Sequence, residues 1–150
     1  EWILRPAPGL QLDGSFGYLD AVFESFATGA LADYTGNDLP RAPRHKLHLG
    51  VQYGWEVAGW GLLGRVDYTN QSHMFFDASN AAGQKQAGFI NLDARLAATS
   101  PDGRWEVSLW GKNLTDELVA TYANGFAPYG QVVVPYAPPR TYGLTLAWRM

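Results

Sequence analysis

The chain has 150 residues and a formal net charge of −3, and only 17% of its residues are charged, while 14% are aromatic. The small acidic balance argues against a nucleic-acid partner, because no surplus of basic side chains can neutralise phosphates. The absence of cysteine excludes a disulfide framework and a thiolate metal site. No run of about 18 apolar residues exists to span a bilayer as a helix. Many aromatic residues and glycines at a slightly negative mean hydropathy are instead typical of a β protein.

Six segments alternate between apolar and polar residues with a period of two, which predicts antiparallel β-strands with two different faces. They cover about residues 10–19, 46–55, 60–68, 90–98, 105–111 and 142–150, and residues 1–4 resemble the end of a further strand. One set of alternate positions carries no charge. The interleaved set carries Asp13, Lys46, Arg65, Asp67, Asp93, Arg95, Glu106, Lys112 and Arg149. The sequence therefore predicts a sheet with one apolar and one water-facing side.

The connections between these segments are alternately short and long. The short ones are residues 6–9, 56–59 and 99–104, the last containing the turn sequence Ser-Pro-Asp-Gly. The long ones are residues 20–45, 69–88 and 113–140, which we expect to lack regular structure. Short turns on one side and long loops on the other are typical of a transmembrane β-barrel.

Aromatic residues of the apolar side are sorted by their height along the strands. Trp55, Trp60, Trp105 and Trp148 fall at the short-turn end, and Tyr18, Tyr68 and Tyr142 fall near the opposite end. Barrels in membranes carry such girdles at both lipid–water interfaces. Each apolar side also spans about 9–11 residues, the length of a tilted membrane-crossing strand. Alternation by itself leaves a soluble lipocalin-like binding barrel open as an alternative, since that class turns its apolar side inward.

Four short motifs resemble a known family in their order and spacing. They are Gly17–Ala21 (GYLDA), Ala42–Leu47 (APRHKL), Asn113–Asp116 (NLTD) and Pro139–Leu146 (PRTYGLTL). Together they resemble the C-terminal β-barrel segment of a TonB-dependent outer-membrane receptor. The resemblance implies that residues 1–150 are the C-terminal portion of a plugged barrel of about 22 strands. The plug domain and the segment that engages the energy-transducing TonB complex would then lie upstream.

The same resemblance implies a place in the bacterial outer membrane, in contact with its lipid, and a function in energy-coupled import. A ferric siderophore is the default ligand, whereas cobalamin, haem, nickel complexes and oligosaccharides are the family's other substrates. A passive porin or small outer-membrane barrel remains the alternative. We expect no cofactor and no enzyme activity, because no nucleophile elbow, phosphate loop or pair of catalytic carboxylates occurs.

Two groups of residues are candidates for functional sites. On the polar side, Arg65, Asp67, Asp93 and Arg95 are expected to form a charge ladder along the lumen wall, and Trp110 to pack on the plug. In the long loops, the candidates for capturing a ligand are His73, Phe75, Phe76, Tyr122, Phe126 and Tyr129. Packing of the loops on one another is the alternative explanation for these aromatic side chains. We expect no metal site, because a single loop histidine is a weak signal.

Overall fold

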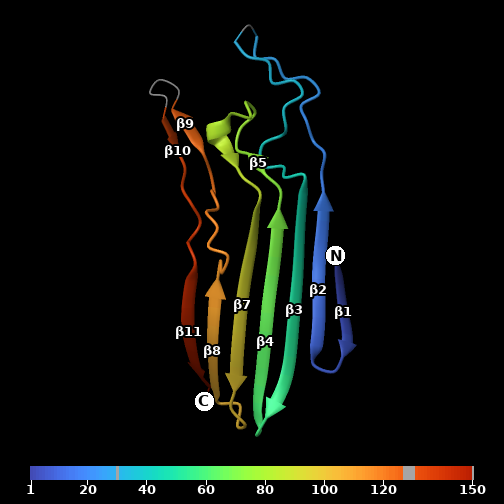
Figure 1. Ribbon diagram of the computed structural model, residues 1–150, viewed down its shortest axis with the longest axis vertical. Coiled ribbons are helices and arrows are strands. Elements are labelled where there is room, and N and C mark those ends of the chain that lie inside the picture. Colours follow the sequence, from blue (N-terminus) through green and yellow to red (C-terminus); the bar gives the residue numbers. More distant parts are fainter. Residues whose placement is uncertain (30, 127–130, 150) are drawn as a thin grey trace.

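The computed structural model describes residues 1–29, 31–126 and 131–149. Its main element is a seven-stranded antiparallel sheet in the order β1-β2-β3-β4-β7-β8-β11 (Figure 1). The strands are β1 (Trp2–Ala7), β2 (Leu10–Tyr18), β3 (His45–Val57), β4 (Trp60–Gln71), β7 (Phe89–Thr99), β8 (Trp105–Lys112) and β11 (Thr141–Trp148). The prediction of an all-β segment with six strands and a stub is confirmed, and the stub is β1. No described helix is long and apolar enough to cross a bilayer.

The register of the sheet joins the alternating patterns of single strands into two continuous faces. Leu49 lies opposite Tyr68 and Val51 opposite Val66, so apolar positions of β3 meet apolar positions of β4. Because side chains alternate along a strand, the polar positions meet on the other side. We call these sides the apolar face and the polar face.

The apolar face has no second layer packed on it within the described chain. The side chains of Leu144, Leu109 and Tyr142 are 66%, 58% and 69% exposed. The buried hydrophobic side chains in the described residues are only Phe76, Ala97, Ala120 and Ala123. A sheet that exposes this much apolar surface needs lipid or a partner to cover it.

The short connections lie together at one end of the sheet (Figure 1). Between β3 and β4, Ala58 and Gly59 both have positive φ, 51° and 80°, as a two-residue type I′ hairpin turn requires. Between β1 and β2, Gly9 has a φ of 77°, and a Cβ there would collide with the carbonyl of Gly54. These turns set the register of the hairpins that they connect.

The long loops at the other end contain more regular structure than the sequence predicted. The second long loop folds into β5 (Met74–Phe75), the 3₁₀ turn η1 (Ala82–Gln84) and β6 (Lys85–Gln86), and β5 pairs with β6. The third contains β9 (Asn124–Phe126) paired with β10 (Gln131–Val133). We call the residues 19–44, 72–88 and 113–140, where described, the loop layer.

Candidate functional site: the polar face and the loop layer

Arg65 is the centre of a charged network on the polar face. Its Nη1 and Nη2 donate to the two carboxylate oxygens of Asp13 at 3.0 Å each, and its Nε donates to Asp67 at 2.9 Å. Asp13 and Asp67 lie on β2 and β4, on either side of Gly50 in β3. A Cβ on Gly50 would collide with the Asp13 carboxylate and lie 2.6 Å from Arg65 Nη2. The missing side chain of Gly50 therefore lets the guanidinium of Arg65 reach across β3 and join β4 to β2.

His48 adds an imidazole to this network. Its Nε2 lies 3.7 Å from Asp13 and 3.6 Å from Asp67, and potential ligand atoms of these three residues lie within 4.8 Å of one another. Such a set resembles a metal-binding group in composition. Arg65, however, already donates to both carboxylates and supplies the positive charge between them. Both carboxylates are therefore ion-paired with Arg65.

The expected charge ladder is divided into two separate networks. The register places Arg65 opposite Arg95 and Asp67 opposite Asp93, so like charges face each other across β4 and β7. Arg95 turns away and bonds Glu106 at 2.8 Å. Asp93 accepts the backbone N–H of Asn113 at 2.8 Å, at the point where β8 has ended. The alternating sequence pattern predicted that these four residues share one face. The pairing of Arg65, however, depends on Asp13, which the predicted charge ladder did not include.

Trp110 packs on its own sheet. Its indole covers Gly143 in β11, where a Cβ would collide with the ring, and its Nε1 donates to Thr145 Oγ1 at 3.2 Å. The ring therefore connects β8 to β11 on the polar face. The expected packing of Trp110 on a plug stays a prediction, because the described residues do not include a plug domain.

The aromatic residues of the apolar face lie at the two ends of the strands. At the short-turn end, Trp105 and Trp148 are register partners with ring centroids 6.2 Å apart. Trp55 and Trp60 lie beside the β3–β4 turn, and Tyr18, Tyr68 and Tyr142 lie toward the loop end. Trp2, which the sequence analysis did not single out, also covers the apolar face, over Gly14.

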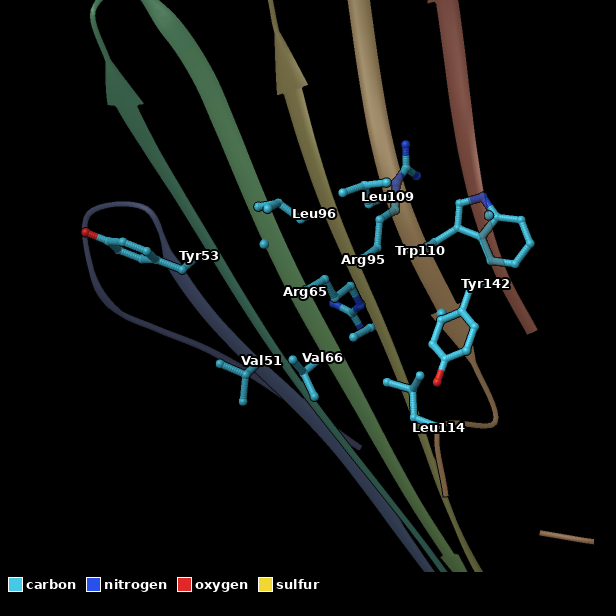
Figure 2. Close-up of a pocket in the computed structure, with 14 residues that line it drawn as sticks. Val51, Tyr53, Arg65, Val66, Arg95, Leu96, Leu109, Trp110, Leu114 and Tyr142 are labelled. Carbon is cyan, nitrogen blue, oxygen red and sulfur yellow. The ribbon is translucent and has the colours of Figure 1, made fainter. Parts of the chain in front are cut away.

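A hollow of about 790 Å³ lies on the apolar face (Figure 2). Small residues of three strands, Gly64, Ala94 and Gly111, are flanked there by larger ones. The labelled flanking residues of the apolar face include Val51, Tyr53, Val66, Leu96, Leu109 and Tyr142 (Figure 2). A ligand pocket needs polar groups that fix the orientation of its ligand, and this apolar face offers few. We therefore do not place the ligand site here.

Phe76 is the centre of a small core in the loop layer. Its side chain is 7% exposed and packs with Ala120 and Ala123, with Met74 and Val134 against them. The residue joins the second long loop to the third. For Phe76 the structure favours loop packing, the alternative that the sequence left open, over direct capture of a ligand.

Polar side chains join all three long loops. Asn80 of the second loop accepts the N–H of Asp38 at 2.8 Å and donates to the carbonyl of Asp38 at 3.0 Å, which attaches the first loop. Gln86, 4% exposed, accepts the N–H of Ala120 and attaches the third. The second long loop is thus the central member of the loop layer.

Two cations lie over aromatic rings in this layer. The Nζ of Lys85 is 5.5 Å from the ring centre of Phe75, and the guanidinium carbon of Arg41 is 5.6 Å from that of Tyr122. His73 contacts Phe75 edge to face at 5.8 Å. The aromatic residues were predicted as candidates, but Arg41 and Lys85 were not, because no sequence spacing connects them to those rings. The side chain of Phe126, in β9, and the whole of Tyr129 lie outside the described residues.

These features together define a segment of an antiparallel transmembrane β-barrel, with paired strands, an apolar outer surface and long loops at one end. The sequence profile of the family described as "TonB dependent receptor-like, beta-barrel" matches residues 2–114, which is most of the chain. The chain therefore belongs to this family, and the predicted resemblance is confirmed. Family membership favours this assignment over a porin or a lipocalin-like binder.

Solved structures support the same fold. The ferric yersiniabactin uptake receptor FyuA from Yersinia pestis is similar with a TM-score of 0.80 and 22% identity, over 97% of this chain and 22% of that one. BauA, the ferric preacinetobactin receptor from Acinetobacter baumannii, is similar with a TM-score of 0.72 and 21% identity, over 97% of this chain and 20% of that one. The chain thus spans about a fifth of the length of these receptors. No curated protein sequence matches it.

Proposed function

We propose that this chain forms part of the wall and the outer loops of an energy-coupled importer in the bacterial outer membrane. In this proposal the apolar face contacts lipid, the polar face lines the lumen, and the loop layer lies at the cell surface. The observation that carries the proposal is that a chain matching the family's barrel profile forms an open sheet with all its long loops at one end.

The open edges of the sheet support a place in a larger barrel. In the described residues β1 and β11 each pair on one side only, with β2 and β8. Backbone groups in lipid must be paired, so a membrane sheet closes on itself. We infer that further strands of a longer protein pair with these edges, and that a plug domain and the contact with TonB belong to the same longer protein.

The expected cargo is a scarce small molecule, with a ferric siderophore as the first candidate. The two similar receptors are described as ferric yersiniabactin and ferric preacinetobactin receptors, which supports iron chelates without identifying one. The loop layer would capture the chelate, and the plug would hold it until TonB opens a path along the polar face.

Uptake of radiolabelled ferric chelates by cells that carry the complete receptor tests this proposal. Uptake that requires both the receptor and TonB is expected, because transport through a plugged barrel needs energy. Uptake that continues without TonB would instead indicate a passive pore. Conductance of the purified receptor in lipid bilayers provides the matching control, since a plugged barrel should stay closed.

A further inference from the structure

The hollow on the apolar face (Figure 2), which we call the groove, begins near the middle of the strands and ends at the loop layer. Val51 lines it from the middle of β3. Tyr142, the second residue of β11, and Leu114, which follows β8, line it at the loop end. In the proposed orientation, with the loop layer at the cell surface, the groove therefore lies mainly in the outer half of the bilayer.

A second hollow, which we call the polar hollow, lies at the loop end of the same face. Asn70 and Ile90 are register partners that line it, and His45, two residues before Leu47 of the apolar face, lines it as well. Its volume is about 470 Å³, within the range of about 300–1,000 Å³ typical of small-ligand sites. Its polar lining residues are His45, Asn70, Gln71, Ser72, His73 and Glu117.

The groove and the polar hollow follow one another along the same pair of strands. Val66 of β4 and its partner Ala94 of β7 line the groove. Four residues further toward the loops, a distance of about 13 Å along a strand, Asn70 and Ile90 line the polar hollow. Tyr68 of the aromatic girdle lies between the two pairs. An apolar groove, an interface ring and a polar hollow are the order of the parts of a lipid, from acyl chain to headgroup.

The chemistry of the polar hollow distinguishes between kinds of headgroup. In the described residues, the hydrogen bonds of His45, His73 and Glu117 use their backbone atoms. Their imidazole and carboxylate groups are therefore available to a ligand without first breaking a contact inside the chain. The carboxylate of Glu117 accepts hydrogen bonds from hydroxyl groups, whereas it repels a phosphate. The polar hollow therefore favours the hydroxyl groups of a sugar over a phosphate headgroup.

We propose that the groove and the polar hollow together bind one glycolipid of the outer leaflet. An acyl chain lies in the groove beside Val66 and Ala94, and a sugar ring of the headgroup lies in the polar hollow, where Glu117 accepts its hydroxyl groups. This inference rests on the part of the proposed function that places the apolar face in lipid and the loop layer at the cell surface. It assigns His73 to a lipid headgroup rather than to the imported cargo.

The test uses the complete receptor in phosphatidylcholine vesicles. The probe is a diglucosyl diacylglycerol with a dansyl group on its acyl chain, and the reference is phosphatidylcholine with the same labelled chain. Energy transfer from the receptor's tryptophans measures the binding of each, and the glycolipid should bind more tightly. Glu117→Ala should weaken glycolipid binding about fivefold, as the loss of a hydrogen bond does. Ala94→Leu fills the groove and should weaken it about fourfold, as the displacement of one methylene group does.

Each variant has a matched control. Ala98→Leu makes the same change four residues further along β7, on the same face but outside the groove. Glu24→Ala removes a carboxylate from the first long loop, outside the polar hollow. Both controls should bind the glycolipid as the wild type does.

Equal binding of the glycolipid and the phosphatidylcholine reference, or glycolipid binding that survives both Glu117→Ala and Ala94→Leu, would overturn the inference. Displacement of the glycolipid by free maltose at an equal concentration would also overturn it, because the polar hollow would then bind a soluble sugar without the groove. These results are separate from chelate uptake. TonB-dependent uptake without a glycolipid preference would overturn the inference alone, whereas a glycolipid preference without such uptake would overturn the proposed import alone.

Discussion

The strand wall and the loop layer are ordered by different interactions. In the wall, backbone ladders run the full length of the strands, as between Lys46↔Gln71 and Val57↔Trp60 in the β3–β4 pair. In the loop layer the paired segments contain two or three residue pairs, and order comes from single side chains such as Asn80, Gln86 and Phe76. The stability of the wall should therefore depend on what its two faces contact, whereas the order of the loop layer should depend on individual side chains.

The largest expected effect is a charge placed on the apolar face of the wall. Leu144→Arg should destabilise the membrane-inserted receptor by about 2–4 kcal/mol, because an arginine in the middle of the lipid face is poorly solvated. Urea unfolding of the receptor in lipid vesicles measures the change.

Ala147→Arg is the control in the same strand. Ala147 lies on the polar face opposite Glu106, so an added arginine stays on the water-facing side, near a carboxylate that Arg95 and Arg149 already share. We expect a change within about 0.5 kcal/mol. Equal losses for both variants would contradict the assignment of the two faces to lipid and lumen.

The second-largest effect is expected from a substitution in the loop layer. Phe76→Ala removes the largest residue of the small loop core, and we expect about 3 kcal/mol less resistance to local opening. Limited proteolysis should cleave the second and third long loops faster, because the packing of Phe76 joins them.

The wall should respond little to Phe76→Ala. Its ladders do not involve this residue, so the urea midpoint of the barrel should stay at the wild-type value. A midpoint that falls together with loop protection would show that the wall and the loop layer unfold as one unit.

A smaller effect is expected from the ion pairs inside the wall. Arg65→Met leaves the carboxylates of Asp13 and Asp67 without their cation and should cost about 2 kcal/mol. Arg95→Met should cost about 0.5 kcal/mol, because the side chain of Arg95 is 53% exposed and its pair with Glu106 is solvated.

A double variant sharpens this comparison. Asp13→Asn removes one of the two carboxylate charges that Arg65→Met leaves unpaired. The loss of unfolding free energy in the double variant should therefore be smaller than the sum of the losses in the two single variants. Additive losses in the urea unfolding of the four proteins would show that Arg65 does not join β2 to β4.

The wall was predictable from the sequence because its two faces follow from a period of two. Pairing in register then brought residues such as Trp105 and Trp148 together, as their positions suggested. The ion-pair partners were not predictable in this way. Arg65 reaches Asp13 over Gly50, a contact that depends on a missing side chain in the strand between them.

The loop layer was not predictable from local sequence. Asn80 bonds Asp38, and Gln86 bonds Ala120, across long stretches of chain with no periodic pattern. The contact between Arg41 and Tyr122 has a similar origin. Arg41 of the first loop lies over the ring of Tyr122 of the third, and both also contact the second loop, at Phe75 and Phe76.

The smallest effect concerns the short turn between β7 and β8. Hydrogen bonds from the Ser100 hydroxyl and from the backbone N–H of Arg104 hold the pKa of Asp102 below its ordinary value. A lowered folded-state pKa stabilises the protein above the pKa of the unfolded state, about 3.9, and this contribution disappears as the pH falls through the folded-state pKa. Asp102→Asn should therefore lower the urea midpoint slightly near neutral pH. The difference in urea midpoint between the variant and wild type should disappear as the pH is lowered below about 4. A difference that stays constant with pH would show that the carboxylate charge does not stabilise this turn.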